Sequence, residues 1–189
     1  LTKDFRTHLL TPSALLQLAE FAEAKQDWPV ATERYTTLIP IAEGTDNQAF
    51  ALRGLAWALL GFAEQLEFLA TLTAEDARAS GAADLEPAFV DAARATCDFY
   101  IDVAACADGI PYWDTGAPGL SALGDWGSRA ADPFNDREPV DSSAAAIGAQ
   151  GLLRFGRVLA RRGEDGDRYT QAGLRALDQL AKLIPEAGR

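Results

Sequence analysis

Two segments of the sequence combine charged and aromatic residues at spacings that suggest a shared site. In the first, Arg53 and Trp57 lie four residues apart in a long apolar segment, which places both on one face of a helix. An inward-facing arginine needs an anionic partner, because an unpaired buried charge is very costly. A uronate carboxylate would serve, and an indole offers a sugar ring an apolar platform. Pairing of Arg53 with Glu43 or Asp46, with Trp57 in the core, explains the same residues without a ligand.

The second segment is a long loop followed by an Ala-rich helix. Trp113 and Asp114 lie in the loop among glycines and prolines, and Asp141 directly precedes Ser-Ser-Ala, which predicts a helix N-cap. Loop aromatics and carboxylates beside a closely packed helix suit a carbohydrate pocket. They equally suit a loop that is fixed to the domain by burying its aromatic side chains. Trp126 and Phe134 are predicted to be such anchors.

Composition excludes several classes of function. The net charge is −11, with 17 Lys and Arg against 28 Asp and Glu, which disfavours nucleic acid and anionic membrane surfaces as partners. No apolar run approaches the roughly 20 residues that cross a bilayer. The single histidine has no His or Cys companion at ligand spacing, so no metal site is predicted. Low cysteine use and no visible signal peptide favour the cytoplasm.

The hydrophobic pattern is helical throughout, and no alternating β-pattern is present. The helices are predicted at about 13–22, 29–39, 47–72, 84–105, 142–162 and 167–184, with Asp84 as one N-cap and Gly163 as a helix end. Residues 107–141 form a long loop of a length that is usually functional. Cys97 and Cys106 are nine residues apart, roughly 13 Å along a helix, so we expect two buried thiols and no disulfide.

The predicted fold class is all-α. The helices form antiparallel pairs, and pairs that repeat about every fifty residues suggest an α/α solenoid or toroid. About three pairs fit the chain, which is half of a six-pair toroid. The chain begins at Leu1 and contains no methionine, which also favours a fragment.

At these residues the chain resembles glycoside hydrolase family 88, the unsaturated glucuronyl hydrolases, and more distantly the unsaturated rhamnogalacturonyl hydrolases. The family shows RGQAW before a hydrophobic helix, and residues 53–57 read RGLAW. It also shows a WD loop and then DSSAAAI leading to GLL, which are found here at 113–114, 141–147 and 151–153. The resemblance covers roughly residues 40–185.

The resemblance implies an (α/α)6 barrel that removes a 4,5-unsaturated uronic acid from the non-reducing end of lyase-generated oligosaccharides. In the family an aspartate protonates the vinyl ether double bond and activates water, without a metal or organic cofactor. Carried over by motif, Arg53 and Trp57 would bind the uronate, and Glu43 falls where the family commonly has a substrate-contacting Gln. Trp113, Asp114 and Asp141 would line the same pocket.

The chain also departs from the family. The His-Gln-Gly turn of the family reads Ala-Glu-Gly at 42–44, and Leu55 replaces the glutamine of RGQAW. The catalytic aspartates of the family precede these motifs and have no counterpart here, so the catalytic residues are unknown. We therefore expect residues 1–189 to be a single α/α-barrel domain that lacks its N-terminal half.

The predicted partner is an unsaturated uronyl oligosaccharide. Two other functions fit the same sequence. One is a non-catalytic carbohydrate-binding α/α domain that kept the pocket and lost the acids. The other is an interaction scaffold of helical repeats, which would bind no sugar.

Overall fold

The computed structural model describes residues 46–183 and, before them, only residues 19, 22, 24, 25, 30, 31, 33 and 34. For residues 46–55 it describes the backbone and not the side chains. The two helices predicted before residue 40 lie outside the continuous described range, as does Glu43.

The described chain is helical, which confirms the all-α prediction. Its helices are α3 (Asp46–Leu69), α4 (Ala74–Ala79), α5 (Ala82–Phe99), α6 (Ser142–Arg161) and α7 (Asp167–Leu183), with a π-turn η1 (Tyr100–Ala104) and a 3-10 helix η2 (Pro118–Leu123). Extended pairing within this part is limited to two isolated bridges, Ala105 with Pro111 and Tyr112 with Val140. None of the described helices is both long and apolar enough to span a membrane.

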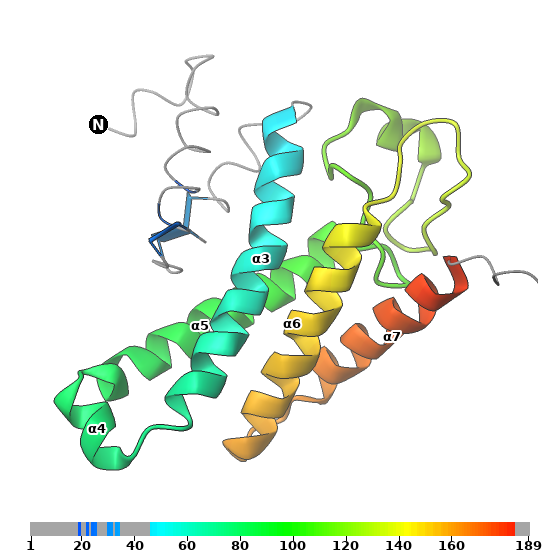
Figure 1. Ribbon diagram of the computed structural model, residues 1–189. Helices are drawn as coiled ribbons and strands as arrows, with labels where there is room; N and C mark the ends of the chain where they lie inside the picture. The colour runs from blue at the N-terminus through cyan, green and yellow to red at the C-terminus, as the bar shows by residue number, and fades with distance from the viewer. Residues whose placement is uncertain are drawn as a thin grey trace, which may run out of the picture.

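The helices α3 and α6 lie side by side and run in the same direction, while α5 and α7 run back toward the end where α3 and α6 begin (Figure 1). The main core joins α3, α5, α6 and α7, and its largest fully buried side chains include Phe62, Leu59, Phe155 and Leu152. The ring of Phe155 meets that of Tyr169 on α7 edge-on, with 4.9 Å between centroids. The fold is thus two helical hairpins whose leading helices are parallel neighbours.

Close contact between α3 and α6 depends on Gly151. A Cβ at this position would lie 3.0 Å from the backbone nitrogen of Leu60 and 3.1 Å from its Cα, and it would overlap the side chain of Leu59. These distances are shorter than normal van der Waals contact, so only glycine lets the two helices approach this closely. The Ala-rich sequence of α6 therefore fits a helix that is packed on two sides.

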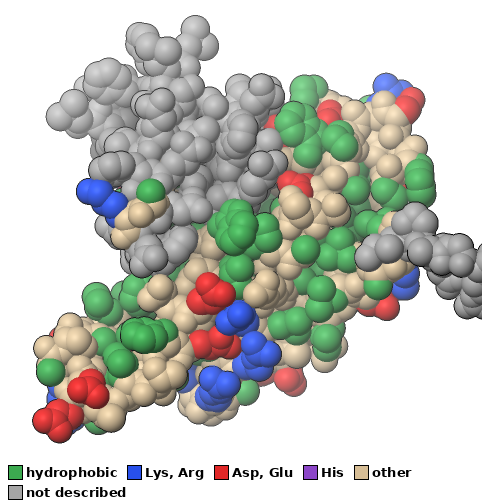
Figure 2. Space-filling model, viewed as in Figure 1, with side chains coloured by type: hydrophobic (Ala, Val, Ile, Leu, Met, Phe, Trp, Pro, Cys, Tyr) green, Lys and Arg blue, Asp and Glu red, His purple; other side chains and the backbone are tan. Residues whose placement is uncertain are grey.

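Ion pairs follow the α3–α6 contact at its solvent-exposed side. Arg154 of α6 pairs with Glu67 of α3 and lies 3.5 Å from Glu64, and Arg157 lies 3.3 Å from Glu67. Figure 2 shows acidic and basic side chains gathered over the lower halves of α3 and α6. The Arg154–Glu67 pair is partly buried, whereas Arg157 is exposed, and an exposed pair contributes about 0–1 kcal/mol.

The predicted limits of α6 are confirmed within a residue, whereas the helix predicted to reach residue 72 ends at Leu69, the helix predicted through 105 is an α-helix only to Phe99, and the predicted start at Asp84 is wrong. Gly163 has φ +75° directly after α6, as a glycine that ends a helix should. The helix α5 begins after Gly81, at φ +73°, and not at Asp84. The reason is α4, a short helix before it that the sequence pattern does not predict, because none of its residues is buried and it has no apolar stripe. Its cap is Thr73, which accepts a hydrogen bond from the Asp76 N–H.

Candidate functional site

The long loop between η1 and α6 is fixed by two carboxylates. Asp108 accepts hydrogen bonds from the N–H groups of Ile110 and Ala131, each at 3.2 Å. Glu138 accepts from the Trp113 indole N–H at 2.6 Å and from the Gly119 N–H at 2.7 Å. Each acid joins parts of the loop that are distant in sequence.

Glu138 is the loop residue that sequence reasoning missed. Its exposed fraction is 8%, and a buried carboxylate is tolerated only when donors surround it. A Cβ at Gly119 would lie 2.5 Å from the Glu138 Oε1, so the glycine is required for the carboxylate to approach the backbone. Nothing in the local sequence distinguishes this acid from its neighbours.

Trp113 and Asp114 serve the loop in this structure. Trp113 packs against the small core formed by Cys106, Tyr112, Ala117 and Leu120. Asp114 is only 1% exposed, and its Oδ1 accepts the Gly116 N–H at 2.8 Å. Both positions agree with a loop that is fixed by buried side chains.

The anchor prediction is confirmed for Trp126 and wrong for Phe134. Trp126 packs edge-on against Tyr112, with 6.0 Å between ring centroids. Phe134 is 92% exposed. The segment around Phe134 turns through two hydrogen bonds that Asp132 accepts, one from the Phe134 N–H and one from the Asn135 side-chain amide, and this turn leaves the phenyl ring in solvent.

Asp141 is the N-cap of α6, as predicted. Its Oδ1 accepts the Ala144 N–H at 2.8 Å and the Ser143 hydroxyl at 2.6 Å. Asp141 and Trp113 line the same small recess, together with Tyr112 and Thr96. The recess has about 10 Å³ of open volume, room for no more than one water molecule. The structure thus brings two predicted site residues together without a sugar-sized cavity between them.

The first motif, residues 53–57, lies on α3. Trp57 is 45% exposed, and Ala56 beside it is buried. The Arg53 side chain lies outside the described atoms, as Glu43 does entirely, so their predicted roles stay predictions. Trp57 does not line the recess that holds Trp113 and Asp141.

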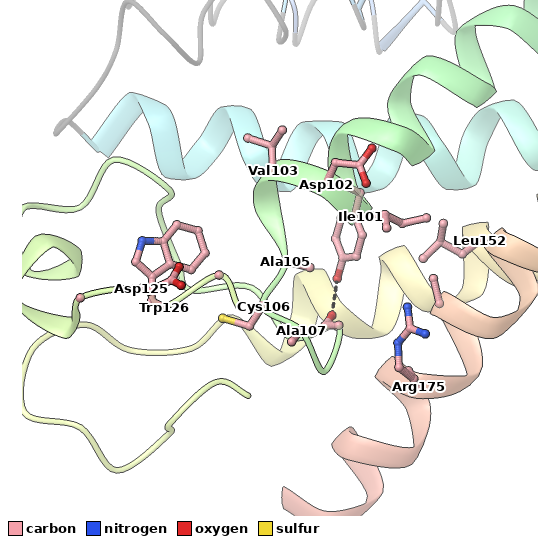
Figure 3. A pocket seen from close by; sticks show the side chains of 15 residues that line it. Ile101, Asp102, Val103, Ala105, Cys106, Ala107, Asp125, Trp126, Leu152 and Arg175 are labelled. Carbon is pink, nitrogen blue, oxygen red and sulfur yellow. Dashed lines mark hydrogen bonds between the residues drawn. The ribbon is translucent and has the colours of Figure 1, made fainter. Parts of the chain in front are cut away.

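A larger cleft of about 470 Å³ opens elsewhere, and no predicted sugar-binding residue lines it. It is bounded by η1, by two parts of the loop and by α7. Figure 3 shows Asp125 and Trp126 at one side of this cleft and Arg175 at the other, with Cys106 and Ala107 between them. The volume falls in the range of small-molecule sites.

The cleft offers binding groups and no activated nucleophile. Burial raises the pKa of the Cys106 thiol to about 12, so the thiol is protonated at neutral pH. Burial likewise raises the pKa of Tyr100, whose hydroxyl donates to the Gly109 carbonyl oxygen at 3.0 Å. Within the described residues, no group of three or more His, Cys, Asp and Glu side chains is placed to hold a metal ion.

Comparisons with other proteins found no match for this chain. No protein-family model, no curated protein and no solved structure matches the chain.

Proposed function

We propose that this chain forms part of an (α/α)6 glycoside hydrolase that acts on 4,5-unsaturated uronic acids at the non-reducing end of oligosaccharides, by hydration of the vinyl ether double bond. In this proposal the RGLAW segment of α3 and the WD loop with the start of α6 form the substrate-binding side. Two parallel helices with antiparallel return helices are the arrangement expected for neighbouring hairpins of an α/α toroid.

The observation that carries the proposal is the register between α3 and α6. The two helices are in contact where Gly151 meets Leu60. Each residue of an α-helix rises 1.5 Å. Residue 53 therefore lies about 10 Å before Leu60 along α3, and residue 141 lies about 15 Å before Gly151 along α6. Position 53 is therefore level with the first turn of α6, although the two motifs are about ninety residues apart in the sequence.

The face of α3 that carries the motif also adjoins α6. Positions 53, 57 and 60 follow the i, i+4, i+7 spacing of one helix face. Leu60, the last of the three, is 6% exposed and lies against Gly151 of α6. Trp57 on the same face keeps nearly half of its surface, which leaves an exposed indole on α3, level with about residue 148 of α6 by the same count. The positive end of the α6 dipole favours an anionic ligand at the start of that helix, where Asp141 already accepts the Ala144 N–H.

The test is turnover of an unsaturated uronyl disaccharide by the complete enzyme that contains this chain, followed by loss of the ultraviolet absorbance of the double bond. We expect Arg53→Ala to raise KM more than about tenfold, the loss of one charge-assisted contact. Arg161→Ala is the matched control, since Arg161 is an exposed arginine in the last turn of α6, at its opposite end. An unchanged KM for Arg53→Ala would refute the role of that residue.

Calorimetry of the same disaccharide separates the alternatives. Binding by the complete protein without loss of absorbance would refute hydrolysis and favour a non-catalytic carbohydrate-binding domain. Absence of both binding and turnover would refute the proposal and leave the interaction scaffold.

A further inference from the structure

We propose a second site: the cleft between α7 and the loop binds a small zwitterion, whose carboxylate contacts Arg175 and whose ammonium group contacts Asp125 and Trp126. The cleft does not include Trp57, Trp113 or Asp141, and Tyr100 separates it from the small recess that holds Trp113 and Asp141, since it lines both.

The cleft has an apolar floor and a polar rim. Leu152 of α6 and Ala172 of α7 line it and are buried, together with Tyr100 and Ala105. With about 470 Å³ of volume, it has room for a ligand much larger than a single ion. An extended molecule with an apolar middle and charged ends suits this shape.

Arg175 supplies the positive side of the cleft. It extends from α7 toward the residues of the floor (Figure 3). Within the described part of the chain, no ion pair involves Arg175, whereas Arg168 on the same helix pairs with Asp102 at 2.6 Å. The acid three residues further along α7, Asp178, is 2.7 Å from Lys182. The Arg175 guanidinium is thus available to a carboxylate, which it can bind through two parallel hydrogen bonds.

Asp125 and Trp126 supply the negative side. Asp125 is exposed, and its carboxylate accepts one hydrogen bond, from the Ser128 hydroxyl at 2.7 Å. The indole of Trp126 is held edge-on against Tyr112 and is partly exposed. A carboxylate next to an indole suits an ammonium group, which gains both a charge pair and a cation–π contact.

The charges of the cleft favour a zwitterion over a simple ion. Its lining contains three charged side chains, Asp102, Asp125 and Arg175, and Asp102 is already paired with Arg168. One cation and one anion then remain, on different sides of the cleft (Figure 3). A simple carboxylate or amine would satisfy only one of them. Binding is non-covalent, because the buried Cys106 thiol stays protonated.

The experiment is calorimetric titration of the full chain with three ω-amino acids of increasing charge separation: β-alanine, γ-aminobutyrate and ε-aminocaproate. Caproate and hexylamine carry one charge each and are the ligand controls. We expect at least one amino acid to bind with Kd below about 1 mM, and both single-charge controls to bind at least about tenfold more weakly.

Protein variants locate the site. Arg175→Gln and Asp125→Asn should each weaken binding at least about tenfold; both residues are exposed, so the fold tolerates the changes. Arg161→Gln and Asp136→Asn, which lie outside the cleft, should leave Kd unchanged. No binding of any of the three amino acids up to about ten times that Kd, equal binding of caproate, or a Kd unaffected by either cleft substitution would overturn the proposal.

Discussion

Substitution of Gly151 by alanine tests the contact on which the proposed sugar site depends. The added Cβ would lie 3.0 Å from Leu60 N and 3.1 Å from Leu60 Cα, and these backbone atoms cannot rotate away. It would also overlap the side chain of Leu59, which is fully buried and has no free space to enter. The two helices must therefore separate to accept one methyl group.

The expected loss follows from two opposing effects. Overpacking of a close-packed interior costs about 1–3 kcal/mol. The better helix propensity of alanine returns about 0.5–1 kcal/mol. We therefore expect Gly151→Ala to lower the free energy of unfolding by about 1–2 kcal/mol, which corresponds to a fall in Tm of roughly 2–8 °C.

Urea and thermal unfolding, followed by circular dichroism, measure this effect. Gly127→Ala is the control, because nothing lies within 4 Å of a Cβ at that position, and it should change the free energy of unfolding by less than about 0.5 kcal/mol. A Gly151→Ala variant as stable as the unsubstituted chain would show that α3 and α6 do not meet there, so that position 53 need not be level with the first turn of α6.

Three further predictions concern the loop, the helix cap and the buried thiols. Glu138→Ala should lower the free energy of unfolding by roughly 2–4 kcal/mol, measured by urea unfolding, while Asp136→Ala should leave it within about 0.5 kcal/mol. Asp141→Ala should lower the free energy of unfolding by about 1 kcal/mol. Asp141→Ser should keep the cap but weaken disaccharide binding. Disaccharide binding equal to that of the unsubstituted chain would show that Asp141 acts only as a helix cap. Burial holds the pKa of Cys106 at about 12 and raises that of Cys97, so both stay protonated in the folded chain above pH 9, where the unfolded thiols ionise. Stability should thus fall as pH rises from about 9 toward 12, and Cys106→Ala should reduce the slope of urea midpoint against pH.

Local signals explain why the helices were predictable. The Asp141 cap and the glycine at 163 bound α6, and a clear apolar stripe defines α7, so both helices lie within a residue or two of their predicted limits. The helix α4 was not predictable from the sequence, because a six-residue helix without buried residues has no periodic pattern of hydrophobic residues.

The candidate sites were less predictable because they depend on long-range packing. The role of Glu138 arises where Trp113 and Gly119 approach it across the loop, a distance that no local pattern encodes. The larger cleft is assembled from η1, the loop and α7, and much of its lining is alanine and glycine backbone without chemistry of its own. Arg175 is identified as a candidate binding residue only from the structure, where Arg168 and Asp178 on the same helix pair with other groups.

Chemical-shift mapping by NMR, with an unsaturated uronyl disaccharide added to the labelled chain, tests the central claim most directly. If residues 53–57 and the start of α6 bind one ligand, amide shifts will change in that part of α3, in the first turn of α6 and at the Trp113 indole. Unchanged spectra, or changes confined to the cleft around Arg175, would contradict a common uronide site at the beginning of these two helices.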